Sequence, residues 1–178
     1  MYKRQGLDKA AESIRKSREV VITEGQFDVI KLHQEGITNV VACSGTALTE
    51  QQINDLVRRC GAKTVTLCFD GDAAGEKAAY KALEKLQQLV LSETINLRIL
   101  SLPEGEDPDS IAQEQGIDAM AELIHGAPHW VKWWLGREIQ KVDLNDIESV
   151  QQAERGVKRI LSVLPLGPQR AYVERMAK

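Results

Sequence analysis

The chain has 178 residues, of which 43% are apolar and 28% are charged, and its formal net charge is −3. This composition predicts a soluble protein with one core-forming domain and at most a small appendage. It argues against a protein that holds nucleic acid with its whole surface, because such proteins carry an excess of positive charge.

The pattern of apolar residues argues against targeting and membrane segments. No run approaches the roughly 18 consecutive apolar residues that a membrane-spanning helix needs, and the first residues lack the apolar centre of a signal peptide. We therefore expect a cytoplasmic protein with no membrane partner. The three cysteines have no metal-ligand or disulfide spacing, which favours reduced thiols in the core.

Charge is distributed unevenly along the chain. Lys and Arg dominate the two ends, whereas the segment between Arg98 and Lys132 is acidic and contains no Lys or Arg. A solvated acidic face gives such a pattern, and so does a metal site beside a basic rim. The composition leaves both interpretations open.

The first predicted elements are a helix over 7–16, a strand over 19–23 and a helix over 27–35. Glu24 and Gly25 follow the strand, so an acidic residue ends it. Asp28 falls in the first turn of the second helix. It is either a surface acid that the helix dipole favours or a neighbour of a metal site.

A strand over 37–42 comes next, and a further helix begins at Thr49-Glu50 and ends at Cys60. The loop between them is small and rich in hydroxyl groups. Such a loop can cradle a phosphate group, and it can equally be a polar turn without a ligand. Its candidate phosphate-binding residues are Ser44, Gly45 and Thr46.

The run over 64–69 is apolar and β-branched, which is typical of a strand buried on both faces of a parallel sheet. It ends at Asp70-Gly71-Asp72, and a helix follows over 73–89. Two carboxylates one residue apart at a strand end can share a divalent cation, and the helix N-terminus beside them favours a phosphate. The alternative is an ordinary turn in which Asp72 only caps the helix.

A strand over 96–102 leads into an acidic loop and a short helix that begins at Pro108. Asp107 fits the N-cap of that helix. Considered alone, the loop predicts no more than this cap, with Glu106 and Asp109 as exposed acids.

Strands that alternate with helices form parallel sheets, and parallel strands place all their carboxyl ends at one edge. Glu24, Asp70, Asp72 and the loop over 106–109 each follow a predicted strand. We therefore expect them to converge in the crevice where open α/β sheets bind ligands. Because this set contains no His and no thiolate, it suits Mg²⁺ or Mn²⁺ rather than zinc.

From Ile117 onward only helical spacing remains, with helices expected over 117–125, 128–141, 147–164 and 168–177. The joint at 126–128 predicts an α/β domain over 1–125 and a helical subdomain over 126–178. Three tryptophans lie on one face of the second of these helices and favour a packed helix interface over a base-stacking surface. They are Trp130, Trp133 and Trp134.

Together these motifs resemble the Toprim domain that bacterial DnaG-type primases, topoisomerases and some nucleases share. Glu24-Gly25 is similar to the family's Glu-Gly motif, and Asp70-Gly71-Asp72 is similar to its Asp-x-Asp motif. The resemblance to DnaG-type primases in particular rests on four segments that agree in order and spacing. These segments are 23–30, 44–49, 69–75 and 105–109.

The resemblance extends from about Leu7 to the end of the chain, and it implies a Rossmann-like parallel sheet flanked by helices, then a small helical subdomain. It implies the catalytic part of a DNA primase, which joins ribonucleoside triphosphates on a single-stranded DNA template. Asp70, Asp72, Asp107 and Asp109 would hold Mg²⁺ or Mn²⁺. Glu24, as the family's catalytic glutamate, would bind metal or move a proton beside Asp28. Lys77 is a further candidate for phosphate contact, with the loop over 44–46.

DnaG-type enzymes also carry a zinc-binding domain, a basic subdomain that helps to bind template, and a domain that binds the replicative helicase. We expect none of the three in this chain. Two other interpretations of the same carboxylates stay open. A Toprim nuclease would use them to hydrolyse phosphodiesters, and in a non-catalytic binding module they would only cap helices.

Overall fold

The computed structural model describes residues 6–43 and 48–176. The contacts within the chain divide it into two compact units, Met1–Pro128 and His129–Lys178. The sequence pattern places the boundary between the two domains three residues earlier, between residues 125 and 126. We describe each unit by itself.

The first unit alternates helices and strands, as the sequence pattern predicts. Parallel strands need a long crossover between them, and a helix supplies each crossover here. The elements are α1 (Leu7–Ser17), β1 (Glu19–Thr23), α2 (Gln26–Gln34), β2 (Val40–Ala42), α3 (Glu50–Cys60), β3 (Thr64–Phe69), α4 (Ala73–Leu91), β4 (Asn96–Ser101), α5 (Pro108–Glu114) and α6 (Ile117–Gly126).

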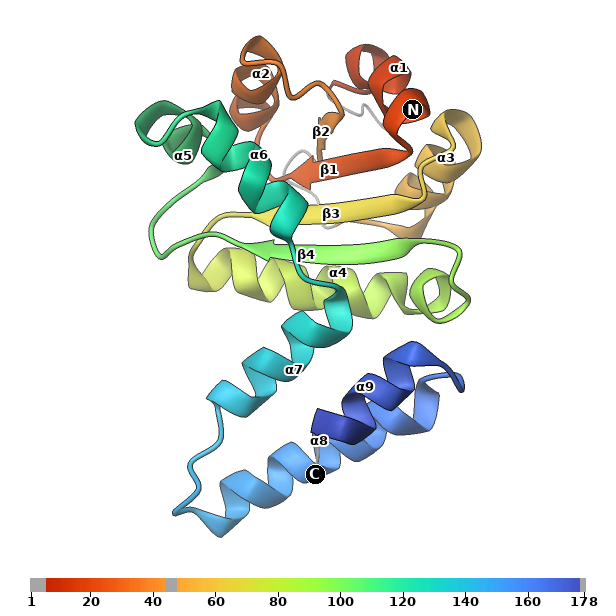
Figure 1. Ribbon diagram of the computed structural model, residues 1–178, viewed down its shortest axis with the longest axis vertical. Helices are drawn as coiled ribbons and strands as arrows, with labels where there is room; N and C mark the ends of the chain where they lie inside the picture. The colour runs from red at the N-terminus through yellow and green to blue at the C-terminus, as the bar shows by residue number, and fades with distance from the viewer. Residues whose placement is uncertain (1–5, 44–47, 177–178) are drawn as a thin grey trace. The chain divides into compact units, whose positions relative to one another are not determined.

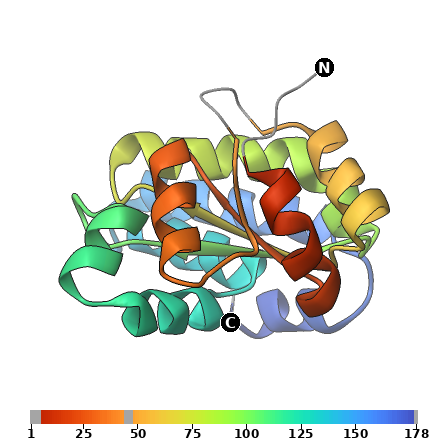
Figure 2. The same ribbon diagram turned by 90° about the horizontal axis from the view of Figure 1, so that it is seen from above.

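The four strands form one parallel sheet in the order β2-β1-β3-β4. Helices α2, α5 and α6 cover one face of this sheet, and α3 and α4 cover the other (Figures 1 and 2). The central strands β1 and β3 are apolar almost throughout because both of their faces are buried. The predicted α/β class with a helix-flanked parallel sheet is confirmed.

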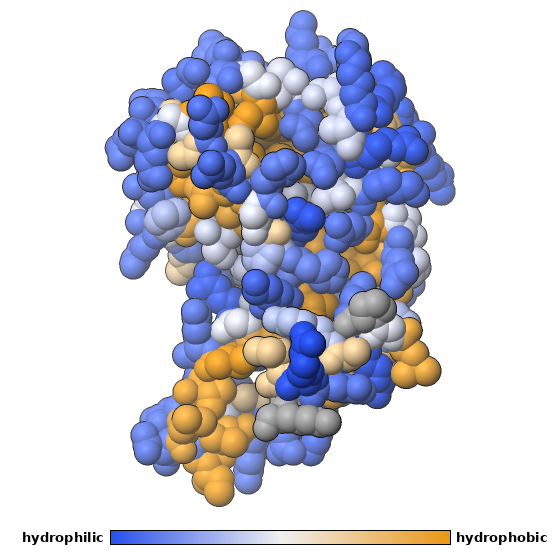
Figure 3. Space-filling model, viewed as in Figure 1, coloured by the Kyte–Doolittle hydropathy of each residue, from blue (hydrophilic) through white to orange (hydrophobic). Residues whose placement is uncertain are grey.

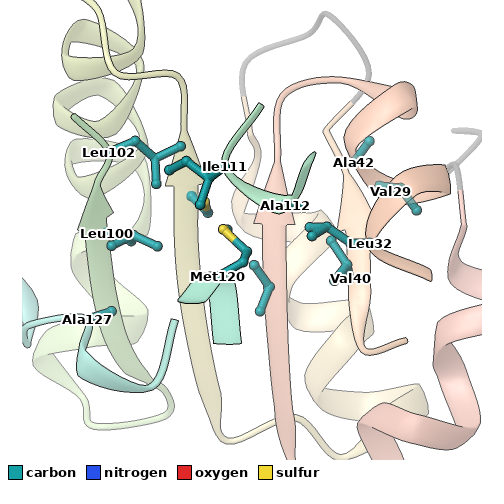
Figure 4. Close-up of a cluster of buried hydrophobic side chains, with 12 residues drawn as sticks. Val29, Leu32, Val40, Ala42, Leu100, Leu102, Ile111, Ala112, Met120 and Ala127 are labelled. Carbon is teal, nitrogen blue, oxygen red and sulfur yellow. The ribbon is translucent and has the colours of Figure 1, made fainter. Parts of the chain in front are cut away.

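The core on the first face joins side chains from strands and helices that are far apart in sequence. Leu32 of α2, Ile111 of α5 and Met120 of α6 are fully buried there against Val21 and Leu100 of the sheet. Figure 4 shows the side chains of this cluster pointing toward one another from these elements. This packing holds α5, and with it the acidic loop in front of α5, against α2 and the sheet.

Two predicted elements begin two or three residues later in the structure than the sequence pattern indicates, and backbone hydrogen bonds explain both. The strand expected over 37–42 begins only at Val40, because the amide of Ile37 donates to the carbonyl of Leu32 (2.9 Å) and so closes α2. The helix expected over 128–141 begins only at Trp130, because the carbonyl of Pro128 accepts from Ile99 of β4 (3.1 Å).

In its described residues the second unit consists of three helices and their connections, and these helices, α7 (Trp130–Gln140), α8 (Ile147–Val163) and α9 (Pro168–Met176), contact one another. Gly156 of α8 lies beside the ring of Trp134, so the missing side chain leaves room for the indole. The turn between α7 and α8 presents apolar side chains to solvent, including Leu144 with 85% of its surface exposed. Figure 3 shows this apolar surface in orange.

All three tryptophans of α7 are buried, which confirms that this face is a packed interface. The free cysteines Cys60 and Cys68 are buried as well. Within the described ranges, no helix combines the length and the apolar character needed to cross a membrane.

We expect Trp133→Ala to lower the free energy of unfolding by about 3 kcal/mol, as deletion of a buried indole does. Trp133 has only 6% of its surface exposed, so the substitution removes packed contacts rather than a surface group. Urea unfolding measures the loss, with Lys132→Ala on the exposed side of the same helix as the control. A stable Trp133→Ala protein with weakened binding of single-stranded DNA would contradict the structural role.

Candidate metal and catalytic site

The candidate site lies at the carboxyl ends of three neighbouring strands. Glu24 follows β1, Asp70 follows β3, and the acidic loop over 106–109 follows β4. These strands are adjacent in the order β1-β3-β4, and they run in the same direction. Parallel pairing therefore brings together acids that are separated by more than eighty positions in the chain.

Gly71 joins the loop after β3 to the loop after β4 through backbone hydrogen bonds. Its amide donates to the carbonyl of Glu106 (2.8 Å), and its carbonyl accepts from the amide of Gly105 (2.9 Å). A Cβ atom at position 71 would overlap the carbonyl oxygen of Pro103. The two loops can approach this closely only because residue 71 has no side chain. Sequence reasoning assigned Gly71 a tight turn and missed this contact.

Gly75 has a similar role at the start of α4. A Cβ atom there would overlap the carbonyl oxygen of Asp70, so the first turn of the helix packs directly on the strand end. The amide of Gly75 also donates to Oδ1 of Asp72 (2.7 Å), which is the N-cap of α4. The positions of Asp70 and Asp72 are therefore set by backbone packing.

Asp72 and Asp107 cap helices, as the simpler interpretation of their motifs predicts, whereas Asp28 is buried and is not the surface acid that was one of its two interpretations. Oδ2 of Asp28 accepts from the amide of Gly25 (3.0 Å), and Oδ1 of Asp107 accepts from the amide of Ser110 (2.6 Å). Oδ1 of Asp109 accepts from the side chain of Gln113 (2.7 Å). Each of these bonds uses one carboxylate oxygen, so a cap and a metal ligand are compatible roles for the same residue.

Glu24 lies in a position that disfavours its charged form. Burial raises the pKa of its carboxyl, and the negative charges of Asp70 and Asp72 raise it further, while the backbone amide of Asp70 donates to it and lowers it. Its Oε1 atom is buried and has no hydrogen-bond partner in the described part of the chain. A buried carboxylate oxygen without a partner is costly unless a proton or a cation satisfies it.

The same physics links the remaining acids. Burial raises the pKa of Asp70, and so do the charges of Asp107 and Asp72. Burial also raises the pKa of Asp28 to about 6, against the opposing hydrogen bond from the Gly25 amide and with the charges of Asp70, Asp107 and Asp109 adding to the effect. Asp70 therefore connects the group, because its charge acts on both Glu24 and Asp28 while the charges of Asp72 and Asp107 act on it.

The chemical type of the possible ligands suits a hard divalent cation. They are all carboxylate oxygens, and one of them, on Glu24, has no hydrogen-bond partner in the described residues. In the described residues these oxygens do not form a complete metal coordination sphere. Among residues 6–43 and 48–176, no three acidic, His or Cys side chains are arranged as a metal-ligand group. Without a cation the like charges of these side chains repel one another.

Of the other candidates for phosphate contact, Lys77 lies within the described residues and the loop over 44–46 lies outside them. Lys77 is exposed on α4, one turn beyond its start. Ser44, Gly45 and Thr46 lie outside the described residues. Cys43 precedes this loop. Burial raises the pKa of its thiol to about 11, and the charge of Glu24 adds to the effect, so Cys43 lies close enough to Glu24 to be affected by it.

We expect the metal-free chain to lose stability as the pH rises from about 4 to about 7. A folded-state pKa of about 6 for Asp28, above its ordinary 3.8, means that the folded chain binds this proton more tightly than the unfolded chain. The stabilisation is complete below about pH 4 and is lost as the pH rises through 6. It corresponds to about 3 kcal/mol.

Urea unfolding in EDTA across this pH range measures the effect. Asp28→Asn flattens the profile, because the amide side chain keeps an acceptor for Gly25 but does not titrate. Asp118→Asn, an exposed acid of α6, serves as the control and keeps the wild-type profile. Parallel profiles for wild type and Asp28→Asn would contradict the assignment.

Comparison with known proteins gives consistent matches. A family model described as Toprim-like matches residues 21–112. A DNA primase of Synechococcus elongatus is 36% identical over 174 residues, which cover 97% of this chain and 25% of that protein. The chain therefore spans about a quarter of the length of this curated relative.

Two solved structures are similar over almost the whole chain. A DNA primase domain from Pseudomonas aeruginosa matches with a TM-score of 0.80 and 33% identity, covering 98% of this chain and 54% of that one. A DnaG primase catalytic domain bound to single-stranded DNA matches with a TM-score of 0.80 and 29% identity, covering 96% and 53%.

Proposed function

This chain belongs to the Toprim-like family, and on that premise we propose that it is the metal-binding catalytic part of a DNA primase. The likeness to DnaG-type primases drawn from the sequence motifs is confirmed by the primase relatives and by the solved catalytic domains. The proposed reaction joins ribonucleoside triphosphates on a single-stranded DNA template, in the cytoplasm.

One observation carries the proposal: at one edge of the sheet, burial and the charges of neighbouring carboxylates raise the pKa values of Glu24, Asp28 and Asp70. Such crowding costs stability, and a functional site is the usual place where a protein retains it. A set of acids that only caps helices would not need a buried, unsatisfied oxygen on Glu24.

Toprim-type primases depend on metal ions, and we propose Mg²⁺ or Mn²⁺ because the donors are all carboxylate oxygens. Asp70 and Asp72 would hold the ion from the loop after β3, and Asp107 and Asp109 would hold it from the loop after β4. When bound, it supplies the positive charge that stabilises the attacking and leaving oxygens of phosphoryl transfer. The hydrogen bonds of Gly71 keep these two loops in register.

Glu24 is the candidate for proton transfer. Burial and the neighbouring charges raise the pKa of its carboxyl, so it can hold a proton more readily than an exposed glutamate. The amide of Asp70 donates to this carboxylate, and it would keep Glu24 oriented toward the two aspartates. Asp28 would support the cluster from the start of α2, where its bond to Gly25 fixes its position.

The proposed partners are a single-stranded DNA template and ribonucleoside triphosphates, by analogy with the DnaG catalytic domain that is solved with single-stranded DNA. Lys77 and the loop over 44–46 are the proposed phosphate contacts. A replicative helicase would be reached only through a domain other than this one.

We expect this chain alone to bind Mn²⁺ and nucleotide weakly and to make no primers at an appreciable rate. Phosphoryl transfer depends mostly on positioning, and a metal site does not hold a template and two nucleotides in line. Ribonucleotide incorporation on single-stranded DNA tests this, first with the chain alone and then with the basic subdomain of a related primase added. Asp70→Asn is the blank in both assays.

Three outcomes separate the alternatives. Synthesis that appears with the added subdomain and disappears in Asp70→Asn supports the proposal. Mn²⁺-dependent cleavage of labelled single-stranded DNA would instead indicate a nuclease. A chain whose stability and nucleotide binding do not respond to Mn²⁺ would be a non-catalytic module.

A further inference from the structure

A group of exposed cations lies at the opposite edge of the sheet from the acidic site. Two segments that are forty residues apart supply it, the end of α1 and the end of α3. Every member is exposed to solvent. We call this group the basic patch, and its residues are Arg15, Lys16, Arg18, Arg58, Arg59 and Lys63.

Backbone contacts hold the two segments together. The carbonyl of Arg18 accepts from the amides of Lys63 (2.7 Å) and Thr64 (3.1 Å). The guanidinium of Arg18 lies directly over Gly61, where a Cβ atom would overlap it. Helices α1 and α3 also contact each other, and Figures 1 and 2 both show them at the end of the sheet where β1 and β3 begin.

Ion pairs involve two of the six cations of the basic patch, and the charge of Arg15 also acts on Glu12. Lys16 pairs with Glu12 at 2.7 Å, and Arg59 approaches Asp55 at 4.0 Å. Across residues 6–43 and 48–176, no ion pair joins an acid to Arg15, Arg18, Arg58 or Lys63. The chain has a net charge of −3, so this local excess is the reverse of its overall balance.

Helix dipoles account for part of the pattern, since the last turn of a helix favours cations. The dipole does not require the two helix ends to be placed together, and it does not explain Lys63, which lies beyond α3. Figure 3 shows a mainly hydrophilic surface over α1 and α3, which suits a charged ligand better than an apolar one.

We propose that the basic patch binds the phosphate backbone of a nucleic acid strand at a second place, separate from the acidic site. The two places are separated by the length of a strand, roughly 17–20 Å for five to six residues. Positive charge here offsets the repulsion that the acidic edge exerts on the same polyanion. The contact is made to phosphates and carries no base specificity.

The test is the salt dependence of binding to fluorescein-labelled oligothymidylate of about twenty nucleotides, measured by anisotropy in EDTA. Log K falls linearly as log salt concentration rises, and each lost phosphate contact makes this fall shallower by about 0.7. Arg58→Gln/Lys63→Gln should make the slope less steep by about 1.4 and weaken binding roughly 25-fold at 0.1 M salt.

The matched control is Lys81→Gln/Lys85→Gln, which removes the same charge from exposed positions of α4. It should leave the slope nearly unchanged. Arg58→Lys/Lys63→Arg keeps both charges and should bind like wild type, which separates charge from folding. Thermal melting of all three variants checks that they are folded.

The measurement is made in EDTA and is repeated in the Asp70→Asn background. Both conditions disable the proposed metal site and leave the cations of the basic patch in place, so the outcome does not depend on the proposed catalysis. Equal losses in the two glutamine variants would overturn the proposal, since they would reflect net charge alone. An unchanged slope in Arg58→Gln/Lys63→Gln would overturn it as well, and would point to a protein partner for this surface.

Discussion

Asp70→Asn is expected to lower the affinity of this chain for Mn²⁺ by more than about a hundredfold. Loss of a residue that only supports a metal ligand lowers affinity by up to about a hundredfold, and loss of a ligand itself should cost more. The free energy of unfolding of the metal-free protein should not fall. Burial and the charges of Asp107 and Asp72 disfavour the ionised Asp70 carboxyl, so a neutral amide relieves repulsion at the same position. Isothermal titration with Mn²⁺ and urea unfolding in EDTA give the two values.

Asp72→Asn should behave in the same way. The side-chain carbonyl of Asn can still accept a hydrogen bond from the amide of Gly75, so the cap of α4 is retained while the charge is removed. Asp118→Asn on α6 changes the net charge equally and should titrate like wild type. An unaltered Mn²⁺ titration in both site variants would refute the assignment of the metal to the loop after β3.

Gly71→Ala is expected to destabilise the protein by about 4 kcal/mol or more, which is exceptional for the addition of one methyl group. The added Cβ atom would overlap the carbonyl oxygen of Pro103, and backbone cannot move aside as the end of a flexible side chain can. Relief requires the loops after β3 and β4 to separate. The hydrogen bonds of Gly71 with Glu106 and Gly105 would then be lost.

Two readouts test this role. Urea unfolding measures the loss of stability. Titration with Mn²⁺ under conditions in which the variant is folded measures whether the aspartates of the two loops still bind the ion jointly. Gly126→Ala at the end of α6 is the control, because no atom lies within 4 Å of a Cβ atom at that position. If Gly71→Ala resembled Gly126→Ala in both measurements, the contact between the loops would be unimportant.

The sequence alone determined the fold class, because the order of the elements depends on local patterns. Alternation between apolar β-branched runs and helical spacing is visible within short windows, and parallel strands follow from it. Asp107 as the cap of α5 is local as well, since a cap involves residues three positions apart. The convergence of acids at one edge could be predicted without coordinates because parallel strands all end at the same edge, whereas the adjacency of β1, β3 and β4 came from the structure.

Only the tertiary structure decided how the loops and helix ends meet. Residue type suggests a turn at Gly71, but its contact with Pro103 spans more than thirty positions and depends on the packing of β3 beside β4. The start of β2 depended on which carbonyl the amide of Ile37 reached. The basic patch joins Arg18 to Lys63 in the same way. Local sequence sets what a segment prefers, whereas contacts between distant segments depend on the packing of the whole sheet and its helices.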